Sequence, residues 1–147
     1  MKILLYDWAL DFIGGGQKYC CDIASLLRKE HEVTLLCRKP VERFFLEEAY
    51  GLDLDGVNFL NLKFRPRCQS VPSGLYNILL QQWNVAGEAA EISPLSAKYD
   101  LFINCESTRA MIKPLSPKSV LVCPFPPRSD LLKEWKAYGP ALKYTYA

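Results

Sequence analysis

The sequence predicts an α/β fold, a three-layer αβα Rossmann-like domain with a mainly parallel sheet. Short apolar, β-prone runs alternate along the chain with stretches of helical periodicity, which is typical of strands joined by crossover helices. The first run, residues 3–6, is apolar throughout, as expected of a strand buried on both faces. Three consecutive glycines, residues 14–16, then precede a helical pattern that ends near Leu27. This strand, glycine loop and helix predict the start of a parallel sheet.

Further strands and helices follow in the same alternation. Apolar runs predict strands over residues 32–37, 57–62, 101–104 and 118–123, and helical periodicity predicts helices over residues 41–50, 75–92 and 130–138. Residues 57–62 alternate apolar and polar side chains, so this strand is expected toward an edge of the sheet. Gly51 is expected to end the helix before it.

Two of these helices carry apolar side chains that are expected to face the sheet. On the helix over residues 41–50 they are Phe44, Phe45 and Ala49. The helix over residues 75–92 has a longer stripe, formed by Leu75, Ile78, Leu79, Trp83, Ala86 and Ala90. Ser93 and Pro94 are expected to end this helix, because proline interrupts helical hydrogen bonding.

The composition is that of one globular domain. The chain has 147 residues, of which 50% are hydrophobic and 23% charged, and its net charge of +2 gives no indication of nucleic-acid binding. No apolar run approaches the roughly 20 residues of a membrane span, and the N-terminus lacks the pattern of a signal peptide. We therefore expect a cytoplasmic protein, with the cytoplasmic membrane surface as an alternative location. Six cysteines without CxxC spacing are expected to be small, reduced core residues, and no metal-ligand set is visible.

The glycine loop is the leading candidate site. It follows a parallel strand and precedes a helix, which places the loop and the first N–H groups of the helix at the carboxyl edge of the sheet. Glycines let the backbone approach a ligand closely and adopt positive φ. Neither the dinucleotide pattern GxGxxG nor the phosphate-binding pattern GxxxxGK[ST] is present. A tight connector without a ligand is the alternative interpretation.

Two parts of the chain, residues 2–37 and residues 119–127, carry a family resemblance. KILLYD, GGGQKYCCDIASLL and HEVTLLC resemble the first strand, glycine loop, first helix and second strand of the N-terminal domain of GT-B glycosyltransferases of the family 4 type. SVLVCPFPP is similar to the strand and Cys-His-Phe-Pro-Pro segment of members that act on lipid-linked oligosaccharides. Pro124 stands where those members often have histidine, so no role of that histidine carries over.

The resemblance implies transfer of a sugar from a nucleotide-diphosphate sugar to a glycan or lipid-linked acceptor, without a metal or other cofactor. It implies that residues 1–147 form the acceptor-side domain, with a truncated sheet, and that the C-terminal donor domain lies outside this chain. The glycine loop would then lie near the donor diphosphate or the acceptor, and its N–H groups would stabilise charge on the departing nucleotide. The substrate-binding positions are Gly14, Gly15, Gly16, Gln17, Lys18, Ser107 and Phe125.

Two carboxylates at strand ends are the candidate catalytic residues. Glu106 and Asp7 each follow a predicted parallel strand, so both are expected at the carboxyl edge beside the glycine loop. A carboxylate there could accept the proton of an acceptor hydroxyl, as inverting transfer requires. Helix capping or solvation of Glu106 is the alternative, and Asp11 in the loop is a third candidate. His31, the one histidine, starts a strand and is expected at the opposite edge.

A basic and aromatic rim is also predicted near this edge. Arg38, Lys39 and Arg43, with the segment KFRPR at residues 63–67, would suit anionic lipid headgroups, and ordinary solvated loops are the alternative. Two other functions stay open for the whole chain. One is a nucleotide- or cofactor-binding Rossmann-like module, against which the missing GxGxxG pattern counts. The other is a non-catalytic interaction half of a two-chain enzyme.

Overall fold

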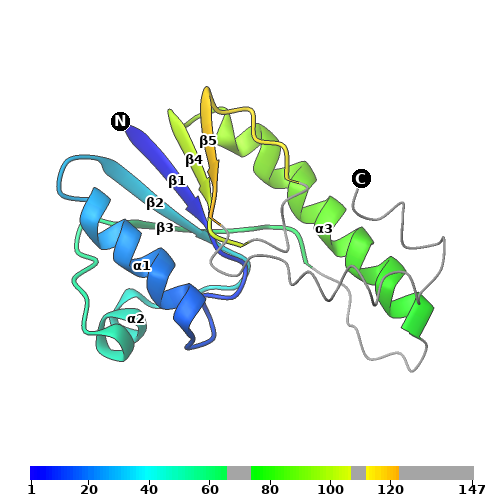
Figure 1. Cartoon of the computed structure of the whole chain (residues 1–147), viewed down its shortest axis with the longest axis horizontal. Coiled ribbons are helices and arrows are strands. Elements are labelled where there is room, and N and C mark those ends of the chain that lie inside the picture. The colour runs from blue at the N-terminus through cyan, green and yellow to red at the C-terminus, as the bar shows by residue number, and fades with distance from the viewer. Residues whose placement is uncertain (66–73, 107–111, 123–147) are drawn as a thin grey trace.

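The computed structural model describes residues 1–65, 74–106 and 112–122, apart from the side chains of residues 74–78 and 81. Within these ranges the chain forms a Rossmann-like α/β domain with one five-stranded parallel sheet (Figure 1). The strands are β1 (Lys2–Tyr6), β2 (Glu32–Cys37), β3 (Asn58–Asn61), β4 (Leu101–Asn104) and β5 (Lys118–Leu121). The helices are α1 (Gly15–Leu27), α2 (Arg43–Tyr50) and α3 (Gly74–Ser96). The predicted helix over residues 130–138 lies outside these ranges.

Strand β1 lies at the centre of the sheet, whose order is β3-β2-β1-β4-β5. Its residues Ile3–Tyr6 are fully buried, which confirms the prediction from their unbroken apolar run. Strand β3 lies at one edge of the described sheet, as its alternating pattern predicted. Strand β5 lies at the other edge, and all of its residues are exposed.

Two apolar cores, one on each face of the sheet, establish the three-layer architecture. Helix α1 covers one face, where its residues Cys20 and Ala24 pack with β1 and with Leu46 of α2. Helix α3 covers the other face, where Ile92 packs with alternate residues of β1 (Figure 1). Side chains of β1 alternate between the two cores, as the pleat of a strand requires.

The prediction for the end of α3 is wrong, and so is that for its buried face at the positions whose side chains are described; those of Leu75 and Ile78 lie outside the described residues. Leu79 and Trp83 are 61% and 58% exposed, and Ala86 and Ala90 are also exposed. The helix instead buries Leu80, Asn84, Val85, Glu88 and Ile92. Its buried face is partly polar because the Tyr6 hydroxyl donates a hydrogen bond to Glu88 Oε2 at 3.0 Å, a partner that helical periodicity cannot reveal.

Helix α3 also continues past Pro94 to Ser96 instead of ending at residues 93–94. Proline in the last turn costs the helix only one backbone hydrogen bond. Ser96 Oγ donates to the Ser93 carbonyl at 2.7 Å and accepts the Leu115 N–H at 2.8 Å. These bonds tie the end of the helix to the segment before β5.

The inward face predicted for α2 is wrong as well. Phe44 and Phe45 are 70% and 40% exposed, Ala49 is exposed, and the buried residue is Leu46. The helix begins at Arg43 and is short, so only the stripe that contains Leu46 and Tyr50, four residues apart, turns toward α1 and the sheet. Gly51 ends the helix as predicted, with a left-handed φ of 66°.

Two predictions from composition can be compared with the described part of the chain. Cys20, Cys21, Cys37 and Cys105 are buried and free, as predicted, whereas Cys68 and Cys123 lie outside the described residues. In the same ranges, no helix has the length and apolar character that crossing a membrane requires.

Candidate functional site

The candidate site lies at the carboxyl edge of the sheet, where β1 and β4 end side by side. Tyr6 is in register with Asn104, and the Cys105 N–H donates to the Tyr6 carbonyl at 2.9 Å. Asp7 and Glu106 therefore leave the sheet at neighbouring positions, and α1 begins at the same edge (Figure 1). This arrangement of the two carboxylates and the glycine loop is the one expected from the strand order of a parallel sheet.

Asp7 is almost completely buried at this edge, with 1% of its surface exposed. Its Oδ1 accepts the Ala9 N–H at 2.8 Å, and the Gln17 side chain lies close enough to favour its charged form. Burial raises the pKa of Asp7 above its ordinary value, while the Ala9 hydrogen bond opposes that rise. The negative charges of Glu106 and Asp11 raise the pKa of Asp7 further.

Glu106 is partly buried, so it is the more accessible of the two strand-end carboxylates. Its backbone N–H donates to Asn104 Oδ1 at 3.0 Å, which closes a tight turn directly after β4. Two other predicted positions, Ser107 and Phe125, lie outside the described residues, as does Pro124.

The glycine loop is held by α2. Gly14 is the N-cap of α1 in an extended conformation, and no side chain caps the helix. The Tyr50 hydroxyl accepts the Gly14 N–H at 3.0 Å and lies 3.3 Å from the Gly14 carbonyl oxygen, to which it can donate. A Cβ atom on Gly14 would stand 2.6 Å from Gln17 Oε1, whereas a Cβ atom on Gly15 or Gly16 would have no such neighbour within 4 Å. None of the three has the positive φ that the sequence allowed.

Gln17 and Lys18, the other predicted binding residues, have different surroundings in the first turn of α1. The Gln17 side chain lies close enough to Asp7 to lower the pKa of that carboxyl. Lys18 forms an ion pair with Asp22 at 3.0 Å, one turn further along the helix. Of these two, only Gln17 therefore contacts the candidate carboxylates.

The loops after β1 and β2 are joined by charged and aromatic contacts. The Arg38 guanidinium lies 4.6 Å from the centroid of the Trp8 ring. Lys39 Nζ forms an ion pair with Asp11 Oδ2 at 2.6 Å and lies 5.6 Å from the Phe12 ring centroid. Asp11 is therefore neutralised by a cation from the neighbouring loop.

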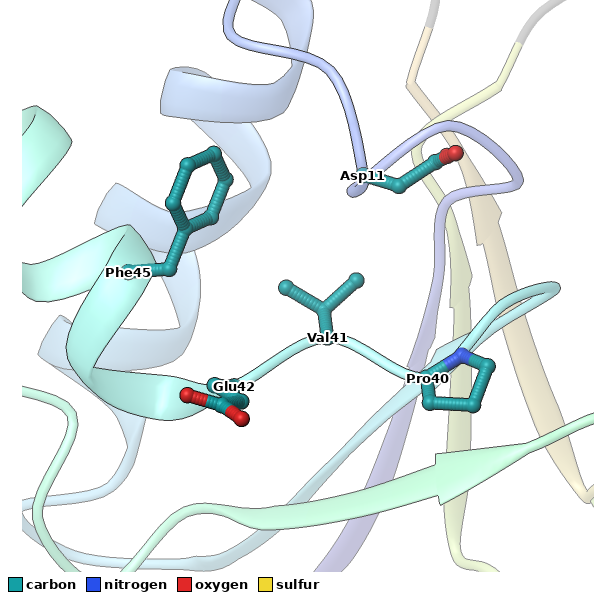
Figure 2. A pocket seen from close by; sticks show the side chains of 5 residues that line it. All are labelled: Asp11, Pro40, Val41, Glu42 and Phe45. Atoms are coloured by element: carbon teal, nitrogen blue, oxygen red, sulfur yellow. The ribbon is translucent and has the colours of Figure 1, made fainter.

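A shallow pocket of about 290 Å³ lies next to these loops, between the segment after β1 and the start of α2 (Figure 2). Figure 2 shows the Phe45 ring and the Val41 methyl groups on facing sides of it, while the Glu42 carboxylate points away. The residues that line the pocket are Asp11, Pro40, Val41, Glu42 and Phe45. Apolar atoms therefore dominate its wall.

The predicted basic rim is only partly assembled. Lys39, Lys63 and Arg65 are exposed at the carboxyl edge, after β2 and β3. Arg43 instead pairs with Asp55 at 2.8 Å, which directs it toward the loop before β3. Arg67 lies outside the described residues.

Two further predictions concern histidine and metal. His31 directly precedes β2, so it lies at the amino edge of the sheet, as predicted. Among the residues that the structure describes, no group of three or more His, Cys, Asp or Glu side chains could hold a metal ion.

The contacts of Tyr50 and Trp8 with the site loops were not predicted from the sequence. Tyr50 reaches Gly14 from a helix that follows it by 36 residues. Tyr50 lies in the last turn of α2, just before the glycine that ends the helix, and this position could be predicted from the sequence. Helical periodicity does not show which residue the Tyr50 side chain contacts.

Comparison with protein-family models, with curated proteins and with solved structures finds no match to this chain.

Proposed function

We propose that this chain is the acceptor-side half of a sugar transferase of the GT-B type. The observation that carries the proposal is the convergence of Asp7 and Glu106 beside the uncapped start of α1. The parallel sheet and the resemblance of residues 2–37 and 119–127 to family 4 glycosyltransferases support it. The reaction transfers a sugar from a nucleotide-diphosphate sugar to an acceptor hydroxyl.

In this proposal Glu106 is the base that receives the proton of the acceptor hydroxyl. It is the more exposed strand-end carboxylate, so a hydroxyl can approach it. Asp7 is too deeply buried to meet an acceptor directly. In this proposal Asp7 does not touch the acceptor, and it contributes negative charge beside Glu106.

The charge around the glycine loop favours an acceptor over a diphosphate at this position. Asp7, Asp11 and Glu106 all contribute negative potential near the start of α1. Lys39 offsets the negative charge of Asp11 by forming an ion pair with it. Lys18 is paired with Asp22 on the same helix. Because a diphosphate would be repelled by the remaining carboxylates while hydroxyl groups donate hydrogen bonds to them, we place the donor diphosphate on the second domain of a complete transferase.

The proposal is tested by saccharide binding to the chain itself. Saturation-transfer NMR with a panel of neutral mono- and oligosaccharides should show binding that is at least fivefold weaker in Glu106→Gln. Glu32→Gln changes an exposed carboxylate at the opposite edge and should leave binding unchanged. Absence of saccharide binding, or equal effects of the two variants, contradicts the proposal. Tight binding of NAD or of a free nucleotide would instead support a Rossmann-like cofactor module.

A further inference from the structure

An apolar stripe runs along the face of α3 that points away from the sheet. Leu79 and Trp83 on this face are 61% and 58% exposed. Exposed residues recur from there at intervals of three or four, which keeps them on one side of the helix and its end. We call the following set of exposed residues the α3 stripe: Leu79, Trp83, Ala86, Ala90, Pro94 and Ala97.

The α3 stripe carries no charged side chain. The charged residues of α3 are Glu88 and Glu91, and the helix contains no lysine or arginine. Glu88 is buried, and Glu91 accepts the backbone N–H groups of Lys63 and Phe64. The outward face of a surface helix is ordinarily charged or polar, so this face has the character of a surface that packs against another apolar surface.

We propose that the α3 stripe is the interface of a homodimer, in which α3 of a second copy packs antiparallel to it across a two-fold axis. An axis that crosses the helix midway between residues 86 and 87 sets Trp83 opposite Ala90 of the other copy, and Leu79 opposite Pro94. The largest side chains of one copy therefore meet small ones of the other, which is how facing helices interdigitate. A two-fold interface requires this self-complementarity, and the requirement favours a second copy over an unrelated partner.

The area of the α3 stripe predicts a weak dimer. From residue 79 to residue 97 the stripe is about 27 Å long. A fully buried aromatic side chain covers about 150–250 Å², so Trp83, which is 58% exposed, contributes on the order of 100 Å² in each copy. The whole stripe is smaller than the roughly 800 Å² on each partner of a stable complex. We therefore expect a dissociation constant in the micromolar range.

The charge of α3 favours a second copy over a lipid bilayer. Helices that lie on membranes carry lysine and arginine beside their apolar face, and α3 has neither. Two copies of an uncharged stripe, in contrast, bring no like charges together.

Dimerisation through α3 leaves the candidate site open. The helix follows β3 and precedes β4, so it begins toward the carboxyl edge of the sheet and ends at the amino edge (Figure 1). Antiparallel packing of two copies therefore directs their carboxyl edges in opposite directions. The inference does not rest on sugar transfer.

Sedimentation equilibrium of the whole chain tests the proposal. The unchanged chain should shift from monomer to dimer as its concentration rises through the micromolar range, without larger species, because a two-fold interface closes on itself. Trp83→Lys and Ala90→Glu should each weaken dimerisation at least tenfold, because each places charges in an interface that holds none. Leu26→Lys and Leu115→Glu are matched controls on other elements, since these leucines are 66% and 64% exposed, and both variants should dimerise as the unchanged chain does.

The antiparallel register is tested by combining the two substitutions. In the double variant Trp83→Lys/Ala90→Glu, each introduced lysine lies opposite an introduced glutamate of the other copy, whereas positions seven residues apart do not pair within one helix. Dimerisation of the double variant should therefore be at least fivefold stronger than that of either single variant. Absence of this recovery would overturn the two-fold arrangement.

A chain that stays monomeric at every concentration, or a dimer that Trp83→Lys leaves intact, would overturn the proposal. In a monomer, flotation with phosphatidylcholine vesicles that Trp83→Lys abolishes would assign the α3 stripe to a bilayer. A lower free energy of unfolding in Trp83→Lys than in Leu26→Lys would instead assign it to a contact within the chain. Glu106→Gln, which tests saccharide binding, should leave the dimer unchanged, so the two proposals fail separately.

Discussion

At the scale of single residues, Asp7 shows how burial changes the protonation equilibrium of a carboxyl group at the candidate site. The residue directly follows a strand that is buried on both faces, and its carboxylate is kept out of solvent. One backbone N–H and the Gln17 side chain compensate part of the lost hydration. The remaining cost of the charged form, together with the charges of Glu106 and Asp11, is expressed as a raised pKa of Asp7.

The raised pKa of Asp7 predicts a specific dependence of stability on pH. Asp7 binds its proton more tightly in the folded chain than in the unfolded chain, so its contribution to stability is largest below the unfolded pKa of about 3.9 and is lost as pH rises through the folded pKa. Asp7→Asn removes this titration while its amide oxygen can still accept the Ala9 N–H. The variant should therefore gain stability relative to the unchanged chain between pH 4 and pH 7.

Urea unfolding at pH 4 and at pH 7 measures this difference. Glu32→Gln is the control, because Glu32 is exposed. The free energy of unfolding of this variant should differ from that of the unchanged chain by nearly the same amount at both pH values. A difference between Asp7→Asn and the unchanged chain that is constant with pH, or that shrinks as pH rises, would contradict the assignment.

At the scale of secondary-structure elements, α3 is attached to the sheet by polar groups at defined positions. Both oxygens of the Glu91 carboxylate accept backbone N–H groups of the loop after β3, from Lys63 and from Phe64, each at 2.8 Å. A Cβ atom on Gly87, one turn earlier in α3, would lie 2.2 Å from the Phe64 ring. The loop and the helix therefore meet where only glycine leaves room for an aromatic ring.

Gly87→Ala should lower the free energy of unfolding by about 1–2 kcal/mol, the net of two opposing effects. Overpacking costs about 1–3 kcal/mol, and the better helix propensity of alanine returns about 0.5–1 kcal/mol. In a Phe64→Ala background the same substitution should become stabilising, because the ring is absent. Denaturant unfolding of the four chains in this cycle measures the coupling.

Gly16→Ala is the matched control, since Gly16 also lies in a helix but faces open space within 4 Å. It should be neutral or slightly stabilising. If Gly87→Ala lowers the free energy of unfolding by the same amount with and without the Phe64 ring, contact with that ring is not the reason for glycine at position 87.

At the scale of the whole molecule, β1 holds the two helical layers together. Its side chains enter both cores, and Tyr6 adds a buried hydrogen bond to Glu88 of α3, across 82 residues of sequence. Both residues are fully buried, so water cannot replace this bond in the folded chain. The interaction therefore contributes to the position of α3 on the sheet as well as to stability.

Tyr6→Phe should lower the free energy of unfolding by about 1–3 kcal/mol, because the buried Glu88 carboxylate loses a donor. Tyr19→Phe changes a tyrosine that is 49% exposed on α1 and should have little effect. Equilibrium unfolding followed by far-UV circular dichroism compares the two. Equal stability of the two variants would show that the Tyr6 hydroxyl contributes nothing to the attachment of α3.

Local sequence was sufficient to predict the α/β class, the parallel sheet and the edge at which Asp7, Glu106 and the glycine loop meet. Strand length, apolar runs and glycines are local properties, and the topology of parallel sheets brings strand ends to one edge without further information. Only the tertiary structure decided which side of α3 is buried, because Glu88 can enter the core only where Tyr6 of the sheet supplies a hydrogen-bond donor. The same reason applies to Tyr50, whose hydroxyl meets Gly14 through packing between distant elements and not through any local pattern.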